Sequence, residues 1–281
     1  MSPLTITIIQ PDLIWENKAA NLEHFDGLIG AIKEKTQIVI LPEMFSTGFS
    51  MRPADLAETM DGPTVAWMKQ TAARKKIILT GSLIIGEEGN YYNRLIWMLP
   101  NGQFGWYDKR HRFAYAGEDE QYTPGHRRLI ASVNGWKVNL LICYDLRFPV
   151  WSRQQIQGPS WSGPFREVPA QEQSLPLAPE YDLLVYVANW PERRSHAWKT
   201  LLQARAIENQ VYTVGVNRVG NDGHNIYHSG DSMIVDPLGE VLYHTSKEES
   251  VFTCTLQREK LEEVRTRLPF WKDADPFRIG P

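Results

Sequence analysis

The sequence predicts an α/β protein in which helices cover a mixed sheet. Runs of apolar, β-branched residues alternate along the chain with segments whose apolar residues recur at helical spacing. Several of these runs are apolar throughout, which is typical of strands buried on both faces. Two runs are joined through residues 86–93, which are rich in Gly and Asn, and this pattern indicates a hairpin. The sheet should therefore contain antiparallel as well as parallel neighbours.

The expected strands are the apolar runs themselves. They cover residues 5–9, 38–41, 77–85, 94–99, 105–107, 138–142, 183–187, 211–216, 232–235 and 251–256.

The expected helices follow from periodicity and from end signals. Residues 22–32 carry apolar side chains at helical spacing, and 64–75 follow Asp61-Gly62-Pro63, with Thr64 as a possible cap. A third helix is expected over 196–210. Pro149 is suited to the first turn of a short helix over 148–155.

The chain of 281 residues and 32.3 kDa is long enough for one large α/β unit, and we expect a single domain over 1–281. Residues 154–180 interrupt the pattern with five prolines and no regular period. We expect an irregular insertion there, either a solvated surface excursion or a flap over the functional site. Trp151, Trp161 and Phe165 are its candidate anchors.

Composition argues against several classes of function. Thirty Lys and Arg against 33 Asp and Glu give a net charge of −3, which offers no basic surface for nucleic acid. The apolar runs are far shorter than the roughly 18 residues of a membrane span, and the start lacks the pattern of a secretory signal, so we expect a soluble, cytoplasmic protein. Two cysteines, Cys143 and Cys254, exclude a disulfide framework, and the seven histidines show no zinc-hydrolase pattern.

Reactive side chains follow four of the apolar runs. Glu43 follows 38–41, Lys109 follows 104–107, Cys143 follows 138–142, and Asn189 follows 183–187. In open α/β sheets, ligands bind beyond the carboxyl ends of the strands. Tertiary folding can therefore bring a carboxylate, an ammonium, a thiol and an amide to one pocket.

Cys, Lys and Glu together suffice for amide or nitrile hydrolysis without a metal or an organic cofactor. A thiol attacks an acyl carbon once a carboxylate takes its proton. An ammonium and a backbone N–H then stabilise the oxyanion, and the same carboxylate activates water against the thioester.

Each of these residues also has a purely structural interpretation. Cys143 is a candidate core cysteine, Glu43 and the basic run around Lys109 are candidates for a solvated surface, and Asn189 is a candidate turn residue. Cys254 alternates within a strand pattern and is expected to be structural. The combination of the first three residues favours the catalytic interpretation.

The chain resembles the nitrilase superfamily of carbon–nitrogen hydrolases, most closely its ω-amidase branch. The resemblance covers nearly the whole chain. It rests on Leu41-Pro-Glu-Met-Phe-Ser-Thr-Gly-Phe49, Tyr107-Asp-Lys-Arg-His111, Leu141-Ile-Cys-Tyr-Asp-Leu-Arg-Phe-Pro149, Ala188-Asn-Trp-Pro191, the segment from Trp198 to Asn209, and the segment from Tyr227 to Ser232.

The resemblance implies an αββα sandwich with mixed sheets that pairs across subunits into a four-layer assembly, hence a homodimer or higher oligomer. It implies Glu43 as general base, Lys109 as the ammonium that stabilises the oxyanion, and Cys143 as nucleophile. The N–H of Tyr144 would be a second oxyanion donor. A further glutamate expected after the lysine is assigned to Glu118, with Glu120 as the alternative.

The resemblance also implies the substrate, a 2-oxo dicarboxylic acid monoamide such as 2-oxoglutaramate or 2-oxosuccinamate. Asn189, Trp190, Arg147 and Arg193 are the candidate substrate contacts, with Arg194 as a further source of a guanidinium for the carboxylate. Hydrolysis of N-carbamoyl compounds, nitriles or other aliphatic amides is the alternative within the class. A non-catalytic binding protein on the same fold is the alternative outside it. The insertion at 154–180 departs from the family, whose members connect these strands more briefly.

Overall fold

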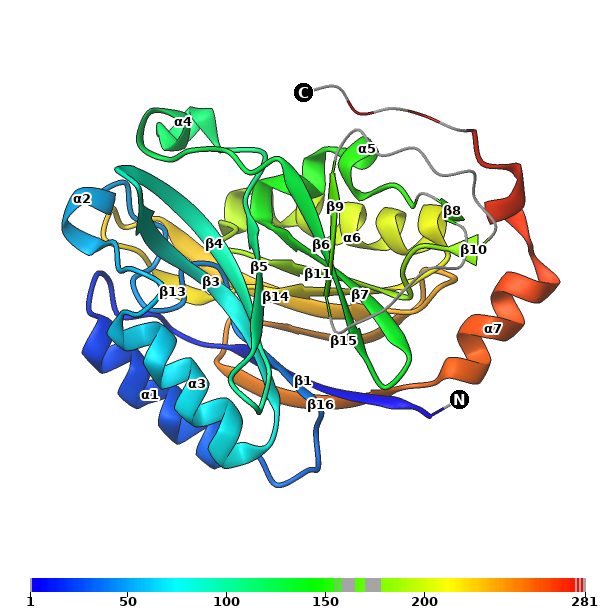
Figure 1. The fold of residues 1–281 in the computed structure, drawn as a ribbon, viewed down its shortest axis with the longest axis horizontal. Coiled ribbons are helices and arrows are strands. Elements are labelled where there is room, and N and C mark those ends of the chain that lie inside the picture. Colours follow the sequence, from blue (N-terminus) through cyan, green and yellow to red (C-terminus); the bar gives the residue numbers. More distant parts are fainter. Residues whose placement is uncertain are drawn as a thin grey trace.

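A computed structural model describes residues 2–154, 178–275, 277 and 279, together with the backbone of 156–157 and 165–169. Two sheets lie face to face, with α1 (Lys18–Gly30) and α3 (Pro63–Lys75) outside one and α6 (Ser195–Asn209) outside the other (Figure 1). The molecule is therefore an αββα sandwich with mixed sheets, which is the fold class that the sequence and its resemblance predict.

The first sheet has a parallel centre and antiparallel edges. Over the described residues it has six strands in the order β16-β1-β2-β3-β4-β5, in which β1, β2 and β3 are parallel neighbours. Its strands are β1 (Leu4–Gln10), β2 (Ile38–Ile40), β3 (Ile78–Glu87), β4 (Asn90–Met98), β5 (Phe104–Asp108) and β16 (Ser250–Leu256).

The second sheet has eight strands within the described part of the chain. Their order is β13-β14-β12-β11-β7-β6-β9, and β15 pairs with β14. Its strands are β6 (Arg127–Val133), β7 (Trp136–Ile142), β9 (Phe165–Pro169), β11 (Leu183–Val187), β12 (Tyr212–Val216), β13 (Val219–Asn221), β14 (Tyr227–Val235) and β15 (Val241–Ser246).

The remaining elements are short, apart from one helix near the C-terminal end. They are α2 (Pro53–Leu56), α4 (Glu118–Gln121), α5 (Pro149–Ser152), α7 (Arg258–Arg267), and the 3₁₀ turns η1 (Ala114–Ala116), η2 (Cys143–Arg147), η3 (Glu192–Arg194) and η4 (Phe270–Asp273).

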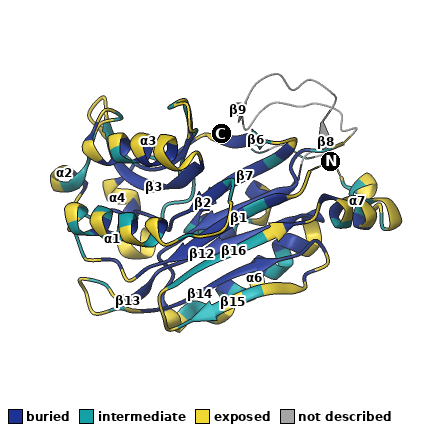
Figure 2. Cartoon of the chain, turned by 90° about the horizontal axis from the view of Figure 1, so that it is seen from below, coloured by how far each residue is buried: buried dark blue, intermediate teal, exposed yellow. Residues whose placement is uncertain are grey.

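Alternation along the strands of the first sheet builds two apolar cores. Ile38 and Ile40 of β2 face the second sheet, whereas Val39 between them packs with α1 and α3. Successive side chains of a strand point to opposite faces, so a fully apolar strand can fill both layers. Figure 2 shows the strands of both sheets largely buried and the outer faces of α1 and α3 exposed. These two cores hold the ends of the strands in fixed positions.

Several boundaries differ from the sequence prediction. The hairpin at 86–93 is tighter than expected, because β3 and β4 continue to Glu87 and Asn90 and leave only Glu88 and Gly89 in the turn. Both turn residues have positive φ, 50° and 78°, as a two-residue turn between twisted strands requires. The expected helix 148–155 is only α5. The elements β6, β13, β15 and α7 were not predicted, because none of them has a long apolar run.

The segment 154–180 is not irregular throughout, and this part of the expectation is wrong. Its residues 165–169 form β9, which pairs antiparallel with β6 at the edge of the second sheet, and β8 (Ile156–Gln157) pairs with β10 (Ala178–Pro179). Prolines are tolerated there because an edge strand need not donate every N–H. Trp151 is buried, and its Nε1 donates to the hydroxyl of Tyr107 at 2.9 Å. Trp161 and the side chain of Phe165 lie outside the described residues.

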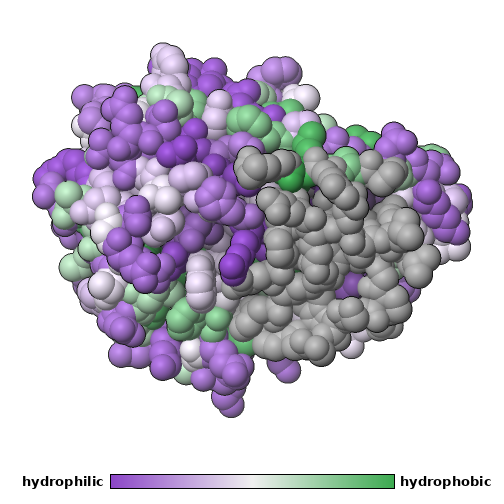
Figure 3. Space-filling view, turned by 45° about the horizontal axis from the view of Figure 1, so that its top comes forward, coloured by the Kyte–Doolittle hydropathy of each residue, from purple (hydrophilic) through white to green (hydrophobic). Residues whose placement is uncertain are grey.

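Hydrophilic residues cover most of the coloured part of the face in Figure 3, and hydrophobic residues gather there in small, separate patches. Within the described ranges, no helix is long and apolar enough to cross a lipid bilayer.

Candidate active site

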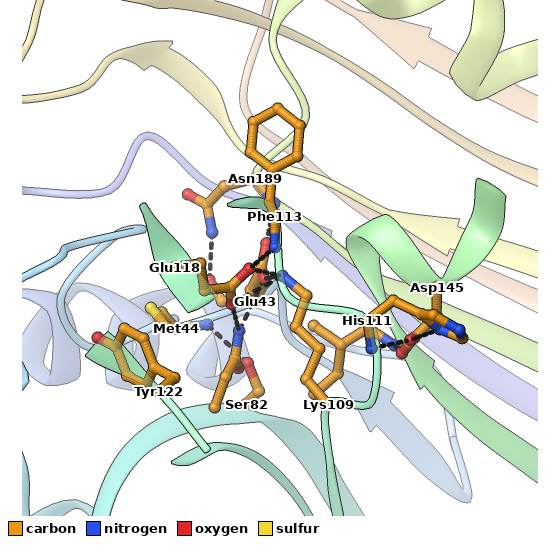
Figure 4. A network of polar contacts seen from close by, with 12 residues as sticks. Glu43, Met44, Ser82, Lys109, His111, Phe113, Glu118, Tyr122, Asp145 and Asn189 are labelled. Carbon is orange, nitrogen blue, oxygen red and sulfur yellow. Dashed lines mark hydrogen bonds and ion pairs between the residues drawn. The ribbon is translucent and has the colours of Figure 1, made fainter. Parts of the chain in front are cut away.

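The four side chains predicted from strand ends lie around one point between the two sheets. Glu43 and Lys109 follow β2 and β5 of the first sheet, and Cys143 and Asn189 follow β7 and β11 of the second. The strands β7 and β11 are parallel neighbours, with Ile142 paired to Val187, so their carboxyl ends emerge together. The close-up in Figure 4 shows Glu43, Lys109 and Asn189 converging with Glu118.

Lys109 joins two buried carboxylates. Its Nζ lies 2.8 Å from Oε1 of Glu43 and 2.9 Å from both carboxylate oxygens of Glu118. All three side chains are buried, with exposed fractions of 1% or less. Burial lowers the pKa of Lys109, but Glu118, Glu43 and Cys143 outweigh it and raise that pKa above its usual value. The side chain is therefore a permanent ammonium at the centre of the site.

Glu43 is fixed by hydrogen bonds from three elements. Besides Lys109, Nδ2 of Asn93 on β4 donates to Oε1 at 2.8 Å, and the backbone N–H of Asn189 donates to Oε2 at 2.8 Å. Asn93 also donates to Glu118, at 3.3 Å, so it bridges the two acids. Sequence reasoning missed Asn93. The signal was a polar pair, Asn93-Arg94, directly before the apolar half of β4.

The two acids proposed for the supporting position have different surroundings. Glu118 is buried, touches Lys109, and accepts a hydrogen bond from the backbone N–H of Phe113 at 2.5 Å. Glu120 is exposed. Burial raises the pKa of Glu118, and Glu43 raises it further against the opposing effect of Lys109. The geometry therefore favours Glu118 as the acid that positions the ammonium.

The backbone is strained at Cys143 and at the residue after Glu43. Cys143 has φ of 43°, and so does Met44, the residue after Glu43. Non-glycine residues rarely adopt positive φ, and such strain gathers at functional sites. The N–H of Met44 donates to Oγ of Ser82 at 2.9 Å, which helps to hold that turn (Figure 4).

Asp145 anchors the turn that presents Cys143. Its Oδ2 accepts hydrogen bonds from the backbone N–H of Ile142 at 3.0 Å and from the hydroxyl of Tyr107 at 2.8 Å. Its Oδ1 lies 3.0 Å from the backbone N and 2.8 Å from Nδ1 of His111. A buried acid thus ties the end of β7 to the chain just beyond Lys109. From the sequence, Asp145 had no predicted role beyond its place in the motif around Cys143.

Cys143 carries its proton at rest. Burial raises the pKa of its thiol, and the nearby charge of Glu43 and a hydrogen bond with that carboxylate raise it further, while Lys109 acts in the opposite direction. The sulfur therefore has a proton acceptor at hand. Cys254 lies on β16, opposite Ile6, and burial alone raises the pKa of its thiol.

The thiol opens onto a cavity of about 220 Å³. Pockets for drug-sized ligands are typically about 300–1,000 Å³, so this volume suits a small molecule. Every candidate substrate contact lies on its wall, namely Asn189, Trp190, Arg147, Arg193 and Arg194, and so does Tyr144. Within the part of the chain that the structure describes, no group of three or more His, Cys, Asp or Glu side chains is arranged to hold a metal ion.

A family model described as carbon–nitrogen hydrolase matches residues 5–157 and 177–266. The chain belongs to the carbon–nitrogen hydrolase family. As such it is a hydrolase of carbon–nitrogen bonds other than peptide bonds. The gap in the match, 158–176, falls inside the segment that we expected to be an insertion.

Relatives of this carbon–nitrogen hydrolase include proteins that carry specific names. Omega-amidase YafV of Escherichia coli is 38% identical over 280 residues, covering 99% of this chain and all of the relative. The 2-oxoglutaramate amidase of Bacillus subtilis is 28% identical, covering 96% of both chains. Among solved structures, XC1258 of Xanthomonas campestris is 40% identical, covers both chains fully and superposes with a TM-score of 0.92. That structure is described as a CN-hydrolase superfamily protein with an arsenic adduct in the active site.

Proposed function

We propose that this hydrolase is an ω-amidase that releases ammonia from the terminal amide of a small 2-oxo dicarboxylic acid monoamide, 2-oxoglutaramate or 2-oxosuccinamate. The names of the E. coli and B. subtilis relatives support the substrate class. The observation that carries the chemistry is the contact between Lys109 and Glu43, 2.8 Å, beside the thiol of Cys143 at the cavity.

In the first half-reaction, Glu43 removes the thiol proton while Sγ of Cys143 attacks the amide carbon. The oxyanion of the tetrahedral intermediate is stabilised by the ammonium of Lys109 and the N–H of Tyr144. The proton held by Glu43 then passes to the amide nitrogen as the C–N bond breaks. Ammonia leaves, and a thioester with Cys143 remains.

In the second half-reaction, Glu43 removes a proton from water as its oxygen attacks the thioester carbon. The C–S bond breaks, the acid product forms, and the proton returns from Glu43 to the sulfur. Glu118 takes no proton in either half. It keeps Lys109 in place and balances its charge, because a buried ammonium without a partner is costly.

The same trio also suits N-carbamoyl compounds, nitriles and other aliphatic amides, because the acyl chemistry is shared. A non-catalytic binding protein on the same fold would gain nothing from burying the charged cluster of Glu43, Lys109 and Glu118 beside a cysteine with a strained backbone.

We further propose one domain for the chain and a four-layer homodimer or higher oligomer. The cytoplasmic location expected from the sequence stays a prediction.

Ammonia release from a panel of monoamides, neutral amides, nitriles and carbamoyl compounds tests the function. We expect the 2-oxo monoamides to give the highest kcat/KM. Cys143→Ala should abolish turnover with little change in stability, whereas Cys254→Ala should remain active. Turnover by the Cys143→Ala protein above a trace would overturn the mechanism, and preference for a nitrile or a carbamoyl compound would overturn the substrate.

A further inference from the structure

Three arginines on the cavity wall have no acidic partner. Over the described residues, the side chains of Arg147, Arg193 and Arg194 make no hydrogen bond or ion pair, although they line the cavity with Cys143. Other arginines of the structure behave differently. Arg94 pairs with Asp108 at 2.7 Å, and Arg218 pairs with Asp12 at 3.0 Å. A group of cations without counter-charges indicates a place for an anion.

Two of these arginines are held by aromatic rings. The guanidinium carbon of Arg147 lies 4.9 Å from the ring centre of Trp190, and that of Arg194 lies 5.0 Å from the ring of Phe113. Stacking on a ring fixes the plane of a guanidinium and leaves its N–H edge free, which suits a carboxylate that accepts two parallel hydrogen bonds. Arg193 is exposed and has no such support.

The positive charges around Arg194 favour the binding of a negatively charged ligand. Burial lowers the pKa of Arg194, and Arg193 and Arg147 lower it further, while Cys143 acts in the opposite direction. The acid on the cavity wall, Asp222, accepts hydrogen bonds from the backbone N–H groups of residues 224 and 226 within its own turn. A bound carboxylate would relieve the repulsion among the arginines.

We propose that Arg147 and Arg194 together bind the carboxylate at the end of the substrate remote from its amide. This proposal rests on the proposed function, in which Cys143 attacks the amide carbon. The other end of the site carries two carboxylates, Glu43 and Glu118, against the single ammonium of Lys109, so it disfavours a further carboxylate. The substrate therefore enters with its neutral amide towards the thiol. Hydrolysis places a new carboxylate beside these two acids, which favours release of the product.

A matched pair of substrates tests this carboxylate clamp, formed by Arg147 and Arg194, during turnover. Succinamate carries the carboxylate, and 4-oxopentanamide replaces it with a neutral methyl ketone of similar shape. We expect Arg147→Gln and Arg194→Gln each to lower kcat/KM for succinamate by about 10- to 100-fold, the effect of losing a hydrogen bond to a charged group, and to change that for the ketone by less than about threefold. Arg194→Lys should be intermediate. Arg267→Gln, which removes an equal charge on the exposed face of α7, should change neither.

Binding to a protein that cannot turn over separates this proposal from the catalytic one. Calorimetry would compare succinamate binding to Cys143→Ala with binding to Cys143→Ala/Arg194→Gln and Cys143→Ala/Arg147→Gln. We expect weaker binding in both double variants. Equal binding in all three proteins, or equal loss of activity for both substrates, would overturn the clamp. Failure of the wild type to hydrolyse 2-oxoglutaramate and 2-oxosuccinamate as well as these two amides would count against the proposed function, while the binding comparison would still decide the clamp.

Discussion

Asn189 holds Glu43 at two points. Its backbone N–H donates to Oε2 of the carboxylate at 2.8 Å, and its Nδ2 donates to the carbonyl oxygen of Glu43 at 2.5 Å. The sequence suggested Asn189 as a substrate contact, and it does line the cavity. These two hydrogen bonds also give it a positioning role, because they join the end of β11 in one sheet to the end of β2 in the other.

Asn189→Ala separates the two roles. The variant keeps the backbone N–H but loses the bond from Nδ2, so Glu43 should be held less firmly. We expect kcat to fall about tenfold, on the scale of one lost buried hydrogen bond, with KM nearly unchanged. Steady-state kinetics with a monoamide substrate checks this. A rise in KM at constant kcat would instead assign the side chain to substrate binding.

Lys109→Met removes the ammonium but keeps most of the side-chain volume. Loss of an oxyanion donor should lower kcat by about 10²–10³. Two buried carboxylates would also face each other, so the free energy of unfolding should fall by roughly 3–5 kcal/mol. Urea denaturation and kinetics measure the two effects.

Adding Glu118→Gln to Lys109→Met provides the control. The double variant should regain part of the stability and none of the activity, because it removes one unpaired charge without restoring the donor. If Lys109→Met changed KM and left kcat unaltered, Lys109 would be assigned to ground-state binding of the substrate.

Glu118→Gln should make the thiol of Cys143 more acidic. Glu118 raises the pKa of the Cys143 thiol, so removing its negative charge stabilises the thiolate and lowers that pKa. The pH profile of iodoacetamide labelling at Cys143 should therefore shift to lower pH. The exposed Glu120 serves as the matched control, and Glu120→Gln should leave the profile where it is. A shift to higher pH for Glu118→Gln would contradict the electrostatic assignment.

His228 should make the fold sensitive to mild acid. Burial and the positive charge of Arg218 lower its pKa from 6.5 to about 4. Between these pH values the unfolded chain binds a proton that the folded protein does not, so stability is lost as the pH falls through this window. The contribution of this residue is about 3 kcal/mol.

Denaturant titrations at pH 7 and pH 4.5 would measure this. His228→Gln should lose less stability than the wild type over this interval, and His196→Gln, at an exposed position on α6, should behave like the wild type. An equal loss in the wild type and His228→Gln would show that other groups carry the acid sensitivity.

Local pattern was sufficient for much of the architecture. The apolar runs without charged or amide residues predict strands such as β2 and β11, because only a strand buried on both faces has no need of such residues. Local pattern did not predict β6 and β13. Neither strand has a long apolar run, and each becomes buried only through its pairing with neighbouring strands. The hairpin was predicted, but its turn was placed over 86–93 rather than at Glu88-Gly89, because the polar residues beside the turn belong to the ends of the strands.

Residue order alone indicated Glu43, Lys109 and Cys143 as candidates, because each stands where an apolar run stops, and a polar group at that place can reach the edge of a sheet. Most of the contacts that build the site join segments 25 or more residues apart. They bring the three side chains together, let Asn93 bridge the two acids, anchor the thiol turn through Asp145 and bury Glu118. Such contacts depend on how two sheets pack against each other. The hydrogen bonds and the local charges of the site therefore depend on the folded chain. The sequence determines which reactions each side chain can perform, because these depend on the residue type.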